Sequence, residues 1–325
     1  MSRSALFSCL LACTVAIGLP AHASDPKAIT VGLIAPTNEA ETLKKWQPVL
    51  DDMAAELKVP VVGMPAKDYG ALIKGMADGK VQVAWFGQKS ALQAITDAHG
   101  EVFAHHVKAD GSKGYSSLLL AAKSSPIRSV DEVIASPGKY SLAMGKPSST
   151  SGFLIPIYNV ITKNKLEMKT HFSRLQTGSH EDNFLAVANG KVDIATNNTD
   201  DFDNFRSKHP SEYAKVKVIW TSEPIGLDPM VMDKRLNAPL KQRIAGFFRA
   251  YGKTAQQKAR LLQANELVGF ARANNKLLSR IADLEAFNEQ YTLMNDESLT
   301  SEQKDAKFKV LFQKHKDTSR LLGGN

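Results

Sequence analysis

A run of small hydroxylated residues, Ser149-Thr150-Ser151, precedes Gly152 and an apolar helical pattern that begins at Phe153. A turn of this kind opens a helix, and the first backbone N–H groups of a helix have no partner within it. Those amides, the side-chain hydroxyls and the positive end of the helix dipole can hold an oxyanion. The alternative is that the hydroxyls only cap the helix, because Ser and Thr are common N-cap residues.

Three further polar residues stand where predicted elements begin or end. His180 opens the next predicted helix, where it could add a charged donor to a bound oxyanion or be an ordinary surface histidine. Asp200 follows a predicted parallel strand, and open α/β sheets hold ligands at the carboxyl ends of such strands. It could accept hydrogen bonds from an ammonium group or simply cap the next helix. Asp228 could face a cleft or belong to an Asp-Pro turn.

The first residues are typical of a secretory leader. Arg3 supplies a positive charge, residues 5–19 are apolar, and Ala21-His22-Ala23 is a small-x-small cleavage site. The apolar run is too short for a membrane span. We therefore predict a cleaved signal peptide at residues 1–23 and a secreted protein that begins at Ser24.

Both cysteines of the chain, Cys9 and Cys13, lie in the predicted leader. The mature chain would therefore have no disulfide, thiolate metal site or cysteine nucleophile. The sequence before Cys13 faintly fits a lipoprotein box, but too little apolar sequence precedes it, so lipid anchoring is not expected. Removing Arg3 lowers the formal charge from +8 to +7. The basic residues are dispersed, which predicts attraction of small anions and no nucleic acid partner.

Alternating strands and helices position these residues. Apolar strands are predicted at 29–35, 59–64 and 81–86, with helices between them, one carrying Pro48 in its first turn. This βαβαβ order favours a mostly parallel sheet flanked by helices. Residues 188–195 echo residues 77–84, which suits a second lobe of similar build.

Two apolar segments predict crossings between the lobes. They are residues 115–122 and 216–232, and together they would form a hinge. Helices are expected at 240–251 and 258–267, and a capping box at Thr300 opens another; we expect them to complete the first lobe and form an outer brace. The predicted division is a signal peptide at 1–23, the first part of lobe 1 at 24–115, lobe 2 at 116–220, and the return crossing with lobe 1 completion and C-terminal helices at 221–325.

With these segments in place, the chain resembles the phosphonate-binding periplasmic proteins that serve ABC importers. The similarity runs from Val31 to about Lys253. It is carried by Asp68-Tyr69-Gly70, Val83-Ala84-Trp85-Phe86-Gly87, Asp110-Gly111-Ser112-Lys113-Gly114-Tyr115, Ser149-Thr150-Ser151-Gly152-Phe153-Leu154, His180-Glu181, Asp193-Ile194-Ala195-Thr196-Asn197-Asn198-Thr199 and Asp228-Pro229.

The resemblance implies a two-lobed α/β periplasmic binding protein that closes on a phosphonate and delivers it to a membrane permease. By the family pattern, the phosphonate oxygens would be held by Tyr69, Ser149, Thr150, Ser151 and His180. The other end of the ligand would face Tyr115, Phe86, Asp200 and Asp228. Carboxylates there would suit the ammonium group of 2-aminoethylphosphonate, which is the expected ligand.

Three departures from the family pattern bear on the substituent of the ligand. Asp200 stands where a glutamate is expected, Phe86 where a tyrosine is expected, and Lys146 where an acidic residue is expected. Phosphite and methylphosphonate carriers of the same fold therefore remain alternatives, as does a receptor for sulfonates or another oxyanion.

A catalytic function has less support in the sequence. A hydrolase built from Ser151 and His180 has no supporting signature. An enzyme acting on phospho-compounds would need a metal or a general base, and the sequence offers no ligand cluster for either. We expect a non-enzymatic receptor that acts as a monomer and holds no metal or cofactor.

Overall fold

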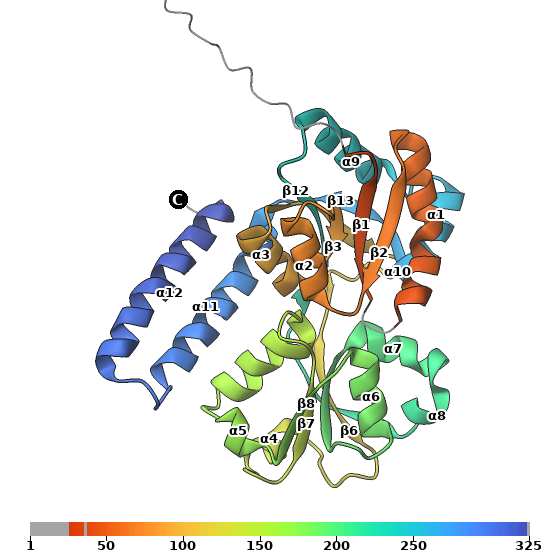
Figure 1. The fold of residues 1–325 in the computed structure, drawn as a ribbon. Helices are drawn as coiled ribbons and strands as arrows, with labels where there is room; N and C mark the ends of the chain where they lie inside the picture. The colour runs from red at the N-terminus through yellow and green to blue at the C-terminus, as the bar shows by residue number, and fades with distance from the viewer. Residues whose placement is uncertain (1–25, 36–37, 324–325) are drawn as a thin grey trace, which may run out of the picture.

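The computed structural model describes residues 26–35 and 38–323. Its strands form two large sheets in two lobes, with helices packed around each sheet (Figure 1). A C-terminal pair of helices runs along one side of both lobes. The two-lobed α/β architecture predicted from the sequence is confirmed, whereas the predicted signal peptide at 1–23 lies outside the described residues.

The sheet of lobe 1 has six strands. Their order across the sheet is β13 (Leu267–Arg272), β4 (Gly100–Lys108), β12 (Pro229–Asp233), β3 (Val83–Trp85), β1 (Ile29–Ile34) and β2 (Val61–Ala66). β1 pairs in parallel with β2 and β3, as the βαβαβ pattern predicts. β12 pairs antiparallel with β3 and β4, and β13 with β4. The prediction of a mostly parallel sheet is therefore wrong in this detail, because β12 arrives from the other lobe rather than through a crossover helix.

The sheet of lobe 2 has five strands. Their order is β10 (Val216–Thr221), β6 (Ser117–Ala122), β9 (Ile194–Asn198), β7 (Ser141–Met144) and β8 (Arg174–Thr177). β7 pairs in parallel with β8 and β9, whereas β6 pairs antiparallel with β9 and β10. Alternate residues of β6 enter different cores: Leu118 and Leu120 one, Leu119 and Ala121 the other. Both faces of the sheet are therefore covered.

The two predicted crossings lie side by side. β5 (Gly114–Tyr115) pairs antiparallel with β11 (Ile225–Gly226), and this two-stranded ribbon joins the lobes. A Cβ atom at Gly114 would lie 1.9 Å from the carbonyl oxygen of Ile225. The approach of the two crossings therefore depends on the absence of a side chain at residue 114.

Five helices of the described residues pack on the sheet of lobe 1. They are α1 (Glu39–Leu57), α2 (Tyr69–Ala77), α3 (Gln88–Asp97), α9 (Ala238–Ala250) and α10 (Ala255–Asn265). The side chain of Asn38 caps α1 by accepting from the N–H of Glu41, so Pro48 lies inside the helix. The prediction that Pro48 occupies the first turn is wrong, because the cap lies ten residues earlier.

Lobe 2 carries shorter helices. They are α4 (Val130–Ile134), η1 (Thr150–Leu154), η2 (Ile157–Thr162), α5 (Met168–His171), α6 (His180–Ala188), α7 (Thr199–Lys208) and α8 (Pro210–Tyr213). α2 and α6 each end before a glycine with positive φ, Gly79 and Gly190. β3 and β9 follow these glycines, so the echo in the sequence marks the same helix–strand junction in each lobe.

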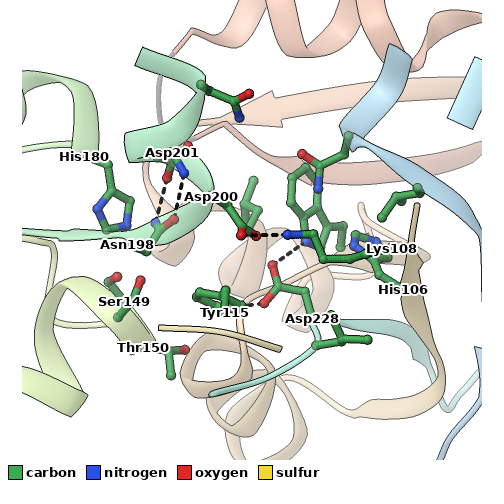
Figure 2. Close-up of a pocket in the computed structure, with 18 of the residues that line it drawn as sticks. His106, Lys108, Tyr115, Ser149, Thr150, His180, Asn198, Asp200, Asp201 and Asp228 are labelled. Carbon is green, nitrogen blue, oxygen red and sulfur yellow. Dashed lines mark hydrogen bonds and ion pairs between the residues drawn. The ribbon is translucent and has the colours of Figure 1, made fainter. Parts of the chain in front are cut away.

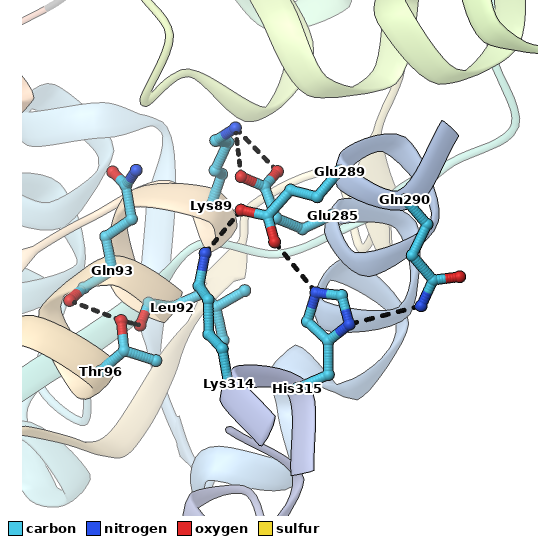
Figure 3. Close-up of polar contacts among 9 residues, drawn as sticks. All are labelled: Lys89, Leu92, Gln93, Thr96, Glu285, Glu289, Gln290, Lys314 and His315. Atoms are coloured by element: carbon cyan, nitrogen blue, oxygen red, sulfur yellow. Dashed lines mark hydrogen bonds and ion pairs between the residues drawn. The ribbon is translucent and has the colours of Figure 1, made fainter. Parts of the chain in front are cut away.

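The C-terminal region forms the outer brace. It consists of η3 (Asn275–Leu278), α11 (Ser279–Met294) and α12 (Ser301–Leu321). Lys89 of α3 is bound by Glu285 of α11, and Lys314 and His315 of α12 bind Glu289 (Figure 3). The prediction that the chain is helical from Leu240 onwards missed β13, whose partners on β4 lie far away in sequence.

Candidate functional site

A cavity of about 80 Å³ lies between the lobes. Its walls come from Ile34, Tyr69, Trp85, Gly87, His106, Lys108, Tyr115, Ser149, Thr150, Ser151, His180, Asn198, Asp200, Asp201, Asn204, Leu227, Asp228, Asn265 and Leu267. Eight of the nine predicted site residues are among them. A water-sized space needs about 10–15 Å³, so there is room for a ligand of several heavy atoms.

The hydroxylated turn forms one wall of the cavity. Ser149 is the N-cap of the helix, and its Oγ accepts a hydrogen bond from the N–H of Gly152 at 3.0 Å. The N–H of Leu154 bonds the carbonyl of Ser149, which is the five-residue spacing of a π-helix. The amides of Thr150 and Ser151 therefore lie in a first turn that offers them no helical acceptor.

The helix departs from the expected α geometry at Gly152. The carbonyl of Gly152 accepts from the N–H of Gly145 at 2.9 Å and from Thr196 Oγ1 at 2.8 Å. A Cβ atom at Gly152 would lie 3.0 Å from Cα of Gly145 and 3.1 Å from a ring carbon of His180. The wider turn places the backbone of Gly152 in contact with Gly145, just after β7. π-type turns are frequent at functional sites.

His180 is the first residue of α6 and lines the same wall. Ser179 and Asp182 form a capping box that fixes the start of this helix. Nδ1 of His180 is buried without a hydrogen-bond partner among the described residues. Burial lowers the pKa of His180, with Asp201 acting in the opposite direction. The ring is therefore neutral at neutral pH, with a polar atom that a ligand can satisfy.

Lobe 1 meets the turn from the opposite side. Thr150 Oγ1 accepts a hydrogen bond from the backbone N–H of Lys89 at 2.9 Å, at the start of α3. Tyr69 is the first residue of α2, which Asp68 caps as predicted. Burial raises the pKa of Tyr69 well above its usual value, while a hydrogen bond with Ser149 opposes the rise. The phenol is therefore neutral, and Tyr69 lines the cavity together with the turn.

Asp228 lies at the other end of the cavity (Figure 2). Its Oδ2 accepts from Trp85 Nε1 at 2.9 Å, and its Oδ1 accepts from the Tyr115 hydroxyl at 3.1 Å. Burial raises the pKa of Asp228 to about 7, and the charge of Asp200 adds to the rise. Burial and the two nearby carboxylates also raise the pKa of Tyr115, which stays a neutral donor.

Asp200 reaches this end of the cavity from the start of α7. Its Oδ1 lies 2.6 Å from Nζ of Lys108, at the end of β4. Burial raises the pKa of Asp200, and Lys108 opposes the rise. Nearby, Asn198 caps α7 by accepting from the N–H of Asp201 and donates to the Asp201 carboxylate at 2.7 Å.

A second ion pair also crosses the cleft, at its rim. Nζ of Lys208, in α7, lies 3.3 Å from Oε2 of Glu41, in α1, and 3.0 Å from Oε1 of Glu181, in α6. Together with the contacts at Thr150 and Lys108, it holds the two lobes close in this structure.

Phe86 is the predicted site residue that does not line the cavity. It is fully buried in the core of lobe 1, with 0% of its surface exposed. The neighbouring Trp85 lines the cavity instead, because successive side chains along a strand point in opposite directions. Residue 86 does not line the cavity, so the replacement of the expected tyrosine by Phe86 removes no hydroxyl from the cavity wall.

Sequence reasoning missed several cavity residues besides Trp85. His106 lines the cavity, and burial lowers its pKa to about 3, so it is uncharged. Lys108, at the end of β4, was missed because a lone lysine has no local signal in the sequence. Asp201 could have been found from the sequence, because it directly follows Asp200 in the first turn of α7.

The cavity has chemically different ends. One end gathers hydroxyls, first-turn amides and a neutral imidazole, which are suited to an oxyanion. The other end holds Asp228 and the Lys108–Asp200 ion pair, and carboxylates are suited to a cation. The described residues contain no group of three or more His, Cys, Asp or Glu side chains placed to hold a metal ion. No helix among them is both long and apolar enough to cross a membrane.

Two lobes joined by a ribbon around a small polar cleft define the class of periplasmic solute-binding proteins. Residues 31–278 match the family model described as "ABC transporter, phosphonate, periplasmic substrate-binding protein". The chain belongs to this family, whose members are binding proteins of ABC transporters rather than enzymes.

Two relatives share more than a third of their aligned residues with this chain. The phosphonates-binding periplasmic protein of Escherichia coli (strain K12) is 40% identical over 306 residues, which are 93% of this chain and 89% of the relative. The crystal structure of a binding-protein component of an ABC phosphonate transporter of Pseudomonas aeruginosa is 36% identical, with a TM-score of 0.84 over 92% of this chain and 99% of that one.

A more distant structure shares the fold. The Prochlorococcus marinus (MIT 9301) protein solved in complex with methylphosphonate is 22% identical, with a TM-score of 0.70 over 80% of this chain and 97% of that one.

Proposed function

We propose that this receptor binds 2-aminoethylphosphonate between its lobes and delivers it to the membrane permease of an ABC importer. The observation that carries the proposal is the division of one cavity into a donor end and a carboxylate end. Ser149, Thr150, Ser151, His180 and Tyr69 would hold the phosphonate oxygens. The ammonium group would lie near Asp228, Asp200 and the hydroxyl of Tyr115.

The donor end supports recognition of the head group. A phosphonate oxygen near His180 would satisfy the unpartnered Nδ1, and the first-turn amides of the helix would donate to others. Hydrogen bonds to a charged oxyanion are roughly twice as strong as bonds between neutral groups. A neutral Tyr69 adds a donor without adding charge.

The carboxylate end supports recognition of the amine. Asp228 accepts hydrogen bonds from two neutral donors, Trp85 and Tyr115. These donors do not neutralise the negative charge of Asp228 when it is ionised. A ligand ammonium would compensate it. A ligand with a second anionic group would instead bring like charges together in a buried place.

Closure links binding to transport. The hydrogen bond from the backbone N–H of Lys89 to Thr150 Oγ1 joins the lobes beside the head-group site. A ligand that bridges the same walls favours the closed arrangement by its differential affinity for it. The permease would then recognise the closed shape.

Calorimetric titration with 2-aminoethylphosphonate, methylphosphonate, phosphite and phosphate in parallel tests the proposal. We expect 2-aminoethylphosphonate to bind most tightly. Tightest binding of methylphosphonate or phosphite would favour the alternative carriers of the same fold. No binding of any of the four would refute the proposed ligand class.

A further inference from the structure

Lys108 places a cation at the carboxylate end of the cleft. Its side chain is 10% exposed, and its Nζ lies 2.6 Å from Oδ1 of Asp200. Lys108 comes from β4 of lobe 1, whereas Asp200 comes from α7 of lobe 2, so the ion pair crosses the cleft (Figure 2). The pair lies beside Asp228, at the position proposed for the ammonium group of the ligand.

The ammonium group of Lys108 changes the net charge that a ligand ammonium meets at this end of the cavity. Asp200 is already paired with a positive charge, so its attraction for a second cation is largely cancelled. Asp228 differs, because its hydrogen-bond partners Trp85 and Tyr115 are neutral. The two carboxylates that the sequence assigns to one role are therefore unequal in the folded protein.

We propose that Lys108 sets how strongly the cleft prefers a cationic substituent over a neutral one, by neutralising Asp200 from the opposite lobe. This inference rests on the proposed function and identifies a specificity-determining residue within it. Lys108 lowers the preference for the amine, and Asp228 supplies most of the preference that the wild-type protein has.

The ion pair also holds the lobes together, and this second effect can be separated from the first. Loss of an interlobe contact weakens closure on every ligand by the same factor. Loss of charge neutralisation changes the ratio between a charged ligand and a neutral ligand of the same shape. The informative quantity is therefore the dissociation constant of n-propylphosphonate divided by that of 2-aminoethylphosphonate, because a methyl group replaces the ammonium.

Lys108→Met removes the charge and keeps an unbranched side chain. We expect the ratio to rise about tenfold relative to wild type, since a freed carboxylate near the ammonium is worth at least that factor. Lys108→Arg, which keeps the charge, should restore the wild-type ratio. An unchanged or lowered ratio in Lys108→Met would overturn the inference. Equal weakening of both ligands would show that Lys108 acts only in closure.

A second pair of variants tests the same idea in the other direction. Asp200→Asn leaves Lys108 without its partner, so the ratio should fall below that of wild type. The double variant with Lys108→Met should bring the ratio back toward wild type, and a ratio that stays low would contradict the proposed coupling. Binding of both ligands to the wild-type protein is measured first. If it binds neither ligand, the proposed function itself fails.

Discussion

Asp228 and Asp200 are identical side chains in one cavity, yet their surroundings give them different properties. Asp228 receives hydrogen bonds from Trp85 and Tyr115, and burial holds its pKa near 7. Asp200 has a lysine within 2.6 Å. The environment, rather than the residue type, therefore decides which carboxylate is available to a ligand cation.

The raised pKa of Asp228 predicts a pH-dependent preference for the amine. A ligand ammonium favours the ionised carboxylate, so binding releases a proton and strengthens as the pH rises through 7. The ionised fraction grows from about a tenth at pH 6 to about nine-tenths at pH 8. The ratio of dissociation constants for n-propylphosphonate and 2-aminoethylphosphonate, measured by calorimetry and divided by the same ratio in Asp228→Asn, should therefore rise about tenfold over this range.

Asp228→Asn is the matched control for this prediction. It keeps the size of the side chain and cannot ionise, so its ratio should be low and should vary with pH only through the ligand head groups. The ammonium of 2-aminoethylphosphonate lowers the second pKa of its phosphonate below that of n-propylphosphonate, so the wild-type ratio is divided by the Asp228→Asn ratio at each pH. A quotient that does not change with pH would contradict the assignment of Asp228 to the ammonium.

Much of the site could be predicted from residue types and their order along the chain. Ser149, Thr150, Ser151 and His180 line the cavity because short turns after strands place them there. The sequence could not show that Trp85 rather than Phe86 faces the cavity, because the packing of neighbouring elements decides which side of a strand faces the cleft. Lys108 escaped notice because a lone lysine has no local signal.

At the level of elements, the helix that starts at Thr150 depends on close backbone packing. The carbonyl of Gly152 is bound by Gly145 and Thr196 rather than only by its own helix. This contact is non-local, so the sequence predicted a helix but not its π geometry. β13 was missed for the same reason, whereas the caps at Asp68 and Thr300 were predicted correctly from local sequence.

Gly152→Ala should destabilise the protein and weaken phosphonate binding. The added Cβ would lie 2.9 Å from Ser149 Oγ and 3.0 Å from Cα of Gly145, so backbone must move. We expect a loss of about 1–3 kcal/mol in the free energy of unfolding, measured by urea denaturation.

Gly246→Ala in α9 is the matched control for this substitution. No atom lies within 4 Å of its added Cβ, so it should stabilise the helix by up to about 1 kcal/mol. Equal effects of the two substitutions would contradict the close packing at residue 152.

Glu285→Ala should be costly because it leaves a buried charge unpaired. Both carboxylate oxygens of Glu285 accept from Nζ of Lys89, at 2.8 and 2.7 Å, and the Lys89 side chain is 6% exposed (Figure 3). We expect destabilisation of about 3–5 kcal/mol by urea denaturation. Ligand affinity should also fall, because the backbone of Lys89 holds Thr150.

Lys314→Ala provides the comparison for the brace. Lys314 pairs with Glu289 at 2.5 Å, but more than half of its side chain is exposed. Exposed ion pairs contribute about 0–1 kcal/mol, so its loss should be small. A small effect of Glu285→Ala as well would show that the brace does not position α3.

At the level of the whole molecule, the ribbon of β5 and β11 sets how the lobes meet. The predicted crossings both exist, and their pairing brings Tyr115 and the Asp228 segment to the cavity together. The two-lobed fold could be predicted because each lobe repeats a local strand–helix pattern. The antiparallel strands could not, because they depend on the path of the chain between lobes.

Gly114→Ala should impair closure rather than specificity. The added Cβ would overlap the carbonyl oxygen of Ile225 and separate the two crossings. The affinities for 2-aminoethylphosphonate and n-propylphosphonate should fall by the same factor in calorimetry, and the free energy of unfolding should fall by about 1–3 kcal/mol. A change in the ratio of the two affinities would contradict a purely mechanical role of the ribbon.

The rim contact between Glu41 and Lys208 offers a practical use, because the residues belong to different lobes. A chain that starts at Ser24 contains no native thiol, since Cys9 and Cys13 precede it. Thiol-reactive dyes attached through Glu41→Cys and Lys208→Cys would therefore label these two sites alone. Energy transfer between the dyes would convert the receptor into an optical sensor of its own opening.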